Sequence, residues 1–298
     1  MATQRQIDQM RERITDEIFL ALGLRKDGIP RRLFGRLFYL PTSRFVHMFA
    51  EADAAVESEG LPGGCRVVME GFRVKLEVNG VEHLAGEGPL MILSNHPGAY
   101  DSVAIGSLVE RKDFRFIVYE IPFYRTLPNI SPRLIYVPKD TSGRMLALRT
   151  AIQHLQEGGA LLQFGAGTIE PDPAVQPGAI EWLSRWSSSV EIMLRKAPET
   201  RVVLTIASGV LLKRFFNHPL AAIQRHPVAR RRVAEFMQVL QQLTIPRSVS
   251  AQARLHFSRP LAAAELIQEA GRGRLMPVLL DRVRALLSEQ AAAANLML

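Results

Sequence analysis

The chain has 298 residues, 47% of them hydrophobic, which is enough for one large folded domain with a helical appendage. Its single cysteine, Cys65, excludes an intramolecular disulfide and predicts a reducing compartment. A formal net charge of +8 and a sequence pI of about 10.0 predict an anionic partner, such as lipid headgroups, nucleic acid or a phosphorylated cofactor.

The sequence predicts neither a membrane span nor a secretory signal. No run approaches the roughly 18 consecutive apolar residues that are needed to cross a bilayer. The first residues, M-A-T-Q-R-Q-I-D, are mostly polar and lack the apolar segment of a signal peptide. We therefore expect a cytoplasmic protein that is not integral to the membrane.

The first part of the chain is predicted to be helical. Apolar residues recur near helical spacing across residues 7–22, and a second helical run follows the Gly-Ile-Pro sequence at 28–30. The Leu-Pro-Gly-Gly sequence at 61–64 then predicts a break, and strict alternation over 72–78 predicts a half-buried strand. We expect a helical N-terminal segment over residues 1–68 and an α/β domain over residues 69–298.

Predicted strands and helices alternate through the second part of the chain. This order predicts an α/β fold with a mixed, mostly parallel sheet flanked by helices. The expected strands span residues 89–94, 114–119, 133–137, 160–164, 201–207 and 253–257. The expected helices lie near residues 101–110, 143–157, 177–196, 220–242 and 275–290.

Two basic stretches favour a membrane surface as a partner. In residues 31–49, arginines alternate with bulky apolar and aromatic residues, which is typical of a helix in a bilayer interface. Between residues 211 and 259, nine cationic residues stand against a single acid, Glu235. A core-facing helix with a solvated basic side explains either stretch at least as well, so only the two together favour lipid.

Residues 95–101, N-H-P-G-A-Y-D, place His96 and Asp101 between a predicted buried strand and a predicted helix. In open α/β sheets, ligands bind beyond the carboxyl ends of the strands. A histidine there can act as a base that a carboxylate orients. The H-x4-D spacing arises by chance in roughly one chain in five, and Asp101 as a plain helix cap remains the alternative.

Two later segments end predicted strands with groups that can bind an anion. Lys139 follows the strand at 133–137, where it could hold a phosphate or carboxylate or lie solvated in a loop. The strand at 160–164 enters a Gly-rich loop whose backbone N–H groups could face an anion. Glu170 takes the place of the third glycine of a dinucleotide fingerprint and prolines follow, which excludes that motif.

Taken in order, these segments resemble the phospholipid/glycerol acyltransferase family, which includes the lysophosphatidate acyltransferases. Residues 95–101 resemble its N-H-x4-D block, and residues 134–139 resemble its second block, which usually ends in arginine. Residues 164–168 resemble its F-P-E-G-T block, and residues 202–210 resemble its apolar fourth block. The resemblance covers roughly residues 70–290.

The resemblance implies transfer of a fatty acyl group from acyl-CoA or acyl-carrier protein to a hydroxyl or amine of a lipid or glycerol-type acceptor. His96 would be the general base and Asp101 would hold its tautomer, with no metal and no cofactor besides the acyl donor. Membrane surface lipids would be partners, at a site peripheral to the membrane. The implied substrate-binding residues are Asn95, Lys139, Gly165, Gly167, Thr168 and Glu170.

The chain departs from the family pattern in two blocks. Gly165 and Ala166 stand where the family has Pro-Glu, and Lys139 stands where arginine is usual, so a glycerol-phosphate acceptor is not implied. Glu170 or Asp172 could supply the missing carboxylate. The alternative function is a catalytically silent lipid-binding or membrane-adaptor protein of the same fold. Nucleic-acid binding rests on charge alone and is not expected.

Overall fold

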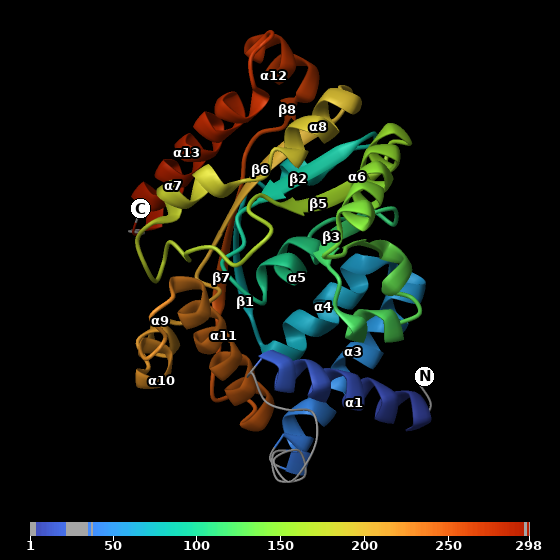
Figure 1. The fold of residues 1–298 in the computed structure, drawn as a ribbon, viewed down its shortest axis with the longest axis vertical. Helices are drawn as coiled ribbons and strands as arrows, with labels where there is room; N and C mark the ends of the chain where they lie inside the picture. Colours follow the sequence, from blue (N-terminus) through green and yellow to red (C-terminus); the bar gives the residue numbers. More distant parts are fainter. Residues whose placement is uncertain (1–3, 22–34, 37, 295–296, 298) are drawn as a thin grey trace.

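The computed structural model describes residues 4–21, 35–36, 38–294 and 297 (Figure 1). Its described strands form one eight-stranded sheet in the order β1-β7-β6-β2-β5-β3-β4, and β8 pairs with β6. The strands are β1 (Lys75–Asn79), β2 (Leu90–Ser94), β3 (Arg115–Tyr119), β4 (Leu134–Val137), β5 (Ala160–Phe164), β6 (Arg201–Ser208), β7 (Gln252–Phe257) and β8 (Leu261–Ala262).

The strand directions confirm the expected mixed, mostly parallel sheet. Parallel pairs join β2 to β5 and β6, β3 to β4 and β5, and β1 to β7. Strand β6 pairs antiparallel with β7 and β8. The amino ends of β1 and β7 therefore lie at the same edge of the sheet as the carboxyl ends of β2, β5 and β6.

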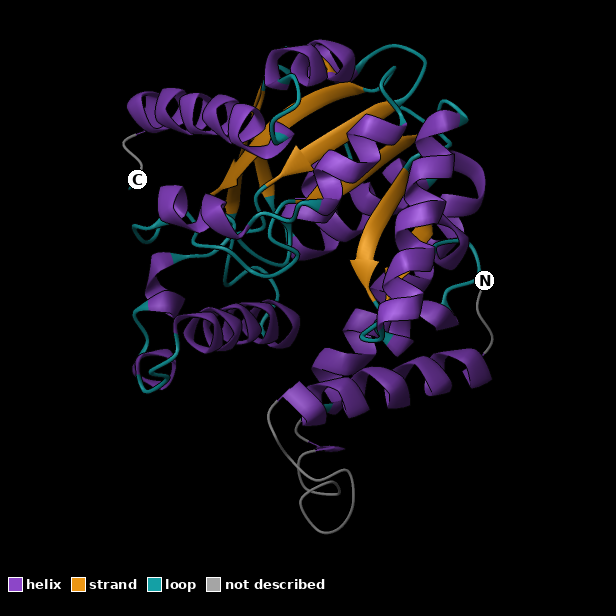
Figure 2. Ribbon diagram, turned by 45° about the horizontal axis from the view of Figure 1, so that its top comes forward, coloured by secondary structure: helices purple, strands orange, loops and turns teal. Residues whose placement is uncertain are grey.

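Helices cover both faces of the sheet (Figure 2). The first face carries α1 (Gln4–Ala21), α3 (Tyr39–Glu59), α4 (Leu61–Phe72) and α5 (Asp101–Gly106). The second face carries α6 (Thr141–Gln156), α7 (Ala179–Trp182), α8 (Ser189–Lys196), α12 (Ala263–Ala270) and α13 (Leu275–Ala294). After β6 come α9 (Lys213–Phe216), α10 (Pro219–Ala222) and α11 (Pro227–Thr244), and α11 packs against α3, α4 and α9.

The two faces follow from the alternation of side chains along the buried strands. In β2, Leu90 and Ile92 enter the core under α3, α4 and α5, whereas Met91 and Leu93 enter the core under α6, α8 and α13. All five residues of β2 are buried. Because both faces are covered, the sequence of β2 is an almost continuous apolar run, as is usual for parallel strands.

The Leu-Pro-Gly-Gly sequence at 61–64 begins α4, so the predicted break at these residues is wrong. The left-handed φ of +73° at Gly60 ends α3, and Pro62 then occupies the first turn of α4. A Cβ on Gly64 would lie 2.5 Å from Val56 Cγ2 and 2.8 Å from the carbonyl oxygen of Ala52. The small residues therefore allow α3 and α4 to approach closely.

Two other predicted helices are each interrupted. The helix expected over 177–196 divides into α7, a 3-10 turn at Leu183–Arg185 and α8, because Trp186 is extended and Ser187 N–H donates to the carbonyl oxygen of Gly165. The helix expected over 220–242 divides into α10 and α11 because Pro227 forces its predecessor His226 out of the helical region. Helix α12 and strand β8 had no predicted counterpart.

The N-terminal helices share the core of the first sheet face. Ile7 and Met10 of α1 belong to the same buried cluster as Leu90 and Ile92 of β2. Part of the basic stretch at 31–49 lies outside the described residues. Among the helices that the structure describes, none is long and apolar enough to cross a membrane. Helix α4 runs through residue 68, where the sequence predicts the domain boundary.

The contact between α3 and α4 predicts a steric penalty at Gly64. Gly64→Val should lower the free energy of unfolding by about 1–3 kcal/mol, because the added atoms meet Val56 and a backbone carbonyl that cannot move aside. Chemical denaturation measures the effect. The control is Arg66→Ala on the same helix, where the side chain is 47% exposed and the change should stay within about 0.5 kcal/mol. Equal stability of the two variants would contradict the packing described.

Candidate active site

Asn95 fixes the chain at the carboxyl end of β2. Strand pairing between β2 and β6 runs as far as Ser94 opposite Thr205. Beyond it, Asn95 Nδ2 donates to the carbonyl oxygen of Ala207 at 2.9 Å, and Ala207 N–H donates to Asn95 Oδ1 at 2.7 Å. The amide of Asn95 thus holds the backbone immediately before His96, and its role in substrate binding stays a prediction.

His96 and Asp101 form a hydrogen-bonded pair, as their spacing predicts. His96 Nδ1 lies 2.8 Å from Asp101 Oδ2, and the carboxyl of Asp101 is fully buried. Asp101 Oδ2 also accepts from Gly98 N–H at 3.0 Å, and Oδ1 accepts from Ser102 N–H at 2.6 Å. With these donors on the carboxylate, His96 Nδ1 carries the proton and Nε2 is the free nitrogen of the neutral ring.

The imidazole of His96 is held on one face and open at one edge. Its ring stacks on Phe164, the last residue of β5, with 4.3 Å between centroids and 19° between planes. No described residue hydrogen-bonds to Nε2, and 26% of the side chain is exposed. The ring is therefore held in place by Asp101 and Phe164, while the side chain stays partly exposed and Nε2 has no described partner.

Glu170 lies next to His96, but both of its oxygens are already used. Oε1 accepts from His96 N–H at 3.2 Å and Oε2 accepts from Trp186 Nε1 at 3.0 Å, while Glu170 N–H donates to the His96 carbonyl oxygen at 2.6 Å. The side chain is 2% exposed, and its burial raises the pKa of Glu170 to about 7. Glu170 thus links the Gly-rich loop to the backbone of His96.

Asp172 does not supply a carboxylate to the site. Its Oδ1 accepts from the N–H groups of Gly209 and Ala174, and its Oδ2 accepts from Leu211 N–H at 3.0 Å. The side chain is fully buried. The hypothesis that Asp172 replaces the missing third-block glutamate is therefore wrong, because its oxygens hold the backbone that follows β6.

Glu235 is a residue of the site that the motifs do not reveal. It lies half-buried on α11, and its Oε1 is 3.7 Å from the position that a Cβ on Gly98 would occupy. No described residue hydrogen-bonds or ion-pairs with its carboxylate. Burial raises the pKa of Glu235 to about 7, whereas the nearby imidazole of His96 lowers it. Its position as the single acid among nine cations was the signal available in the sequence.

Three carboxyl groups set the charge of His96. Burial lowers the pKa of His96, but Asp101, Glu235 and Glu170 together raise it more, to about 9. The imidazolium form is therefore favoured in the free protein at neutral pH. Deprotonation to the form that can act as a base is expected as the pH rises toward 9.

The Gly-rich loop after β5 divides into a packed part and an open part. The indole of Trp186 covers Gly165, so that a Cβ there would lie 2.0 Å from Trp186 Cδ2. Gly165 N–H donates to the carbonyl oxygen of Ser94 at 2.9 Å. By contrast Gly167 is exposed with φ of +61°, and no described group accepts from the N–H of Gly167 or Thr168. Only the second part of the loop offers free donors.

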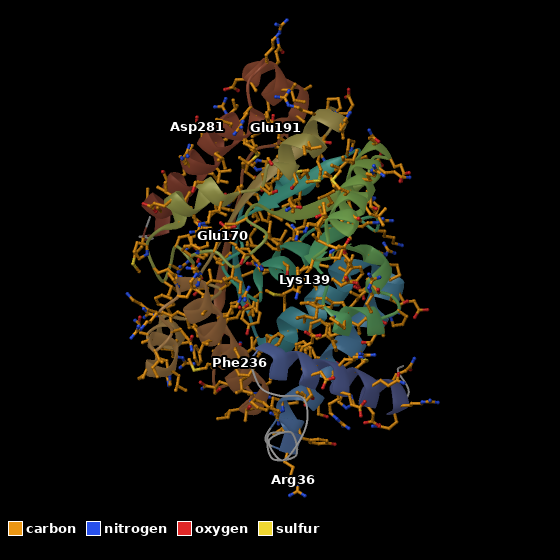
Figure 3. All side chains as sticks on the ribbon, in the orientation of Figure 1. Arg36, Lys139, Glu170, Glu191, Phe236 and Asp281 are labelled. Carbon is orange, nitrogen blue, oxygen red and sulfur yellow. The ribbon has the colours of Figure 1, made fainter. Side chains whose placement is uncertain are left out.

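Lys139 is exposed and follows β4, the outermost strand of the sheet on that side. No described contact joins Lys139 to His96. Strands β5 and β3 separate β4 from β2, so the two strand ends are roughly 14 Å apart at the usual strand spacing. Figure 3 labels Lys139 and Glu170 as separate side chains in the middle of the view. Among the described residues, no three His, Cys, Asp or Glu side chains are grouped as a metal site would require.

Comparison with known proteins gives no match to a protein-family model and none to a curated protein. Among solved structures, the chain is similar to the crystal structure of the 1-acyl-sn-glycerophosphate (LPA) acyltransferase, PlsC, from Thermotoga maritima. The TM-score is 0.47 and the sequence identity 16%, over 96% of this chain and 92% of that chain.

The carboxyl groups around His96 predict that the pKa of its imidazole is raised. In an NMR titration of the histidine ring, His96 should titrate near pH 9 instead of the usual 6.5. Asp101→Asn should lower this pKa by about 1–3, and Glu235→Gln should also lower it, because each change removes a negative charge that favours the imidazolium. Glu181→Gln, on the exposed side of α7, is the control and should leave it unchanged. A wild-type pKa of 6.5 or below would contradict the electrostatics described.

Proposed function

We propose that this protein is an acyltransferase that moves a fatty acyl group from a thioester, acyl-CoA or acyl-carrier protein, to a hydroxyl or amine of a lipid or glycerol-type acceptor. The observation that carries the proposal is the pair of His96 and Asp101, 2.8 Å apart beyond the carboxyl end of a central strand, with no described partner on Nε2. The resemblance of the ordered blocks to the phospholipid/glycerol acyltransferases supports the same chemistry.

In the proposed reaction, Nε2 of neutral His96 accepts the proton of the acceptor hydroxyl or amine as that atom attacks the thioester carbonyl. Asp101 stabilises the imidazolium that forms. The tetrahedral intermediate then expels the thiolate, which takes the proton from His96. The products are an ester or amide and a free thiol, and His96 returns to its neutral form without a covalent acyl-enzyme.

The exposed end of the Gly-rich loop is the proposed oxyanion site. The N–H groups of Gly167 and Thr168 have no described acceptor, so they can donate to the thioester oxygen as negative charge develops on it. Gly165 cannot take part, since its N–H already bonds to Ser94. Acyl transfer involves no redox change, and we propose the acyl thioester as the sole co-substrate, with neither metal nor further cofactor.

We further propose that the protein works in the cytoplasm, at the surface of a membrane, because its acceptor is a lipid and its net charge is +8. Nucleic acid is not a proposed partner. The groups that surround His96 include the carboxyl groups of Asp101, Glu170 and Glu235. This arrangement favours an acceptor that presents a hydroxyl or amine to the site over one that presents a phosphate there.

Loss of the base should abolish the reaction. In an assay of free thiol release from palmitoyl-CoA with a mixed lipid acceptor pool, His96→Ala should reduce kcat by about 10²–10⁴-fold. His47→Ala, at an exposed position of α3, is the matched control and should keep full activity. Full activity of His96→Ala would contradict the mechanism. Absence of acceptor-dependent release from the wild type would favour the silent lipid-binding alternative.

Glu170 is expected to position His96 instead of binding the acceptor. In Glu170→Gln, the amide NH₂ must face one of the two donors that now bond to the carboxylate, His96 N–H or Trp186 Nε1. We expect kcat to fall about tenfold or more, in line with loss of one hydrogen bond to a charged group, with the acceptor KM little changed. Glu181→Gln serves as the control. A raised KM with unchanged kcat would instead place Glu170 in contact with the acceptor.

A further inference from the structure

The segment between β6 and α11 forms a small basic lobe, here defined as residues 213–226, which contains α9 and α10. In Figure 1 the lobe lies at the lower left, next to the start of α11. His218 begins α10, with its Nδ1 accepting from Leu220 N–H at 3.3 Å. Phe215 and Ala221 are buried with Ala234 and Val249 in a core of their own. The basic lobe is therefore an ordered element with a defined outer surface.

The outer surface of the basic lobe is cationic. The sequence has no aspartate or glutamate between Glu199 and Glu235. Within the lobe, Lys213, Arg214 and Arg225 are exposed, and no described acid forms an ion pair with them. Other cations of the stretch noted in the sequence are engaged elsewhere: Arg231 is buried and Arg254 pairs with Glu77 at 3.0 Å. Arg232, Arg247 and Arg259 are exposed as well, so the lobe carries three of the six exposed cations of this stretch, with no acid among its own residues.

Two large aliphatic side chains of the basic lobe are also exposed. Leu220 is 57% exposed and Ile223 is 70% exposed. They are three residues apart along α10 and the residue that follows it, so they lie on one side of the turn. Single exposed apolar residues are ordinary. Two such residues on one ordered turn, beside three unpaired cations, match the composition of a membrane-interface segment.

The basic lobe is joined directly to the site of His96. Residues 209–212, which precede it, are fixed by Asp172 through the N–H groups of Gly209 and Leu211. Gln238 of α11 accepts from Leu212 N–H and donates to the carbonyl oxygen of Val210, both at 2.8 Å. Val210 Cγ2 in turn lies 3.7 Å from the Cβ position of Gly98, within the His96 motif. The segment that leads into the lobe is therefore packed against the His96 motif.

We propose that the basic lobe docks on the surface of a bilayer that contains anionic phospholipid. Leu220 and Ile223 enter the boundary between headgroups and acyl chains, and Lys213, Arg214 and Arg225 contact headgroup phosphates. The docking of the lobe rests on the proposed acyltransferase function, and it names the surface through which the protein would reach its lipid acceptor.

The size of the basic lobe favours lipid over a protein partner. The lobe has 14 residues, of which only part face outward, whereas stable protein interfaces use about 20–30 residues a side. A bilayer needs only a few inserted side chains and a basic rim. The charge of the lobe is complementary to an anionic leaflet, whose attraction for cations weakens as salt screens it.

The test measures co-sedimentation of the full-length protein with vesicles of phosphatidylcholine mixed with phosphatidylglycerol, and with phosphatidylcholine alone. The wild type should bind the mixed vesicles, and less tightly at high salt. The double variant Leu220→Asp/Ile223→Asp should lower the partition coefficient about tenfold or more. The triple variant Lys213→Gln/Arg214→Gln/Arg225→Gln should lose the preference for phosphatidylglycerol. Circular dichroism and a thermal melt confirm that both variants fold.

The matched control is Met145→Asp/Leu146→Asp on α6, where both side chains are also exposed; it should bind vesicles as the wild type does. His96→Ala should also bind normally, so a failure of the acyl-transfer mechanism leaves this test unaffected. Unchanged vesicle binding by the lobe variants, an equal loss in the α6 control, or no binding by the wild type would each overturn the proposal. Lobe-dependent binding of an acidic acyl-carrier protein without vesicle binding would also overturn it.

Discussion

The candidate site depends on how the backbone is fixed where β2 ends. At that point the strand ladder stops, and the side-chain amide of Asn95 replaces it with two hydrogen bonds to Ala207. One residue later, the backbone of His96 is bonded at both its N–H and its carbonyl oxygen to Glu170. The chain that carries the imidazole is therefore held from β6 on one side and from the Gly-rich loop on the other. Asp101 and Phe164 then need only to orient the ring.

Charge is separated in this protein between the site and its surroundings. Around His96 lie three carboxyl groups, and burial raises the pKa of both Glu170 and Glu235 to about 7. Three exposed cations of the same region, Lys213, Arg214 and Arg225, lie on the basic lobe, which begins three residues after Val210. The basic lobe therefore favours a negatively charged surface. The carboxyl groups around His96 favour hydrogen-bond donors such as hydroxyl groups. In the proposed function, the two preferences act on different parts of one lipid molecule.

The sequence predicts the features that depend on local pattern. Apolar runs bounded by turn residues locate β2, β5 and β6, and the spacing of His96 and Asp101 across a strand-to-helix turn predicts their contact. The sequence does not reveal contacts between residues that are far apart along the chain. Glu235 reaches the site from α11, and Trp186 covers Gly165 because the chain leaves the helix that periodicity predicts there. The pattern also cannot show that the carboxylate oxygens of Asp172 accept hydrogen bonds from backbone N–H groups.

The bond between Trp186 and Glu170 has an optical consequence. The chain contains two tryptophans, and the indole N–H of one of them donates to a carboxyl group that also holds the backbone of His96. Protonation of Glu170 changes the electric field along that indole and weakens the bond it donates. The other tryptophan, Trp182, lies under the guanidinium groups of Arg185 and Arg231. We therefore expect the emission of Trp186 to change as Glu170 ionises, without any added label.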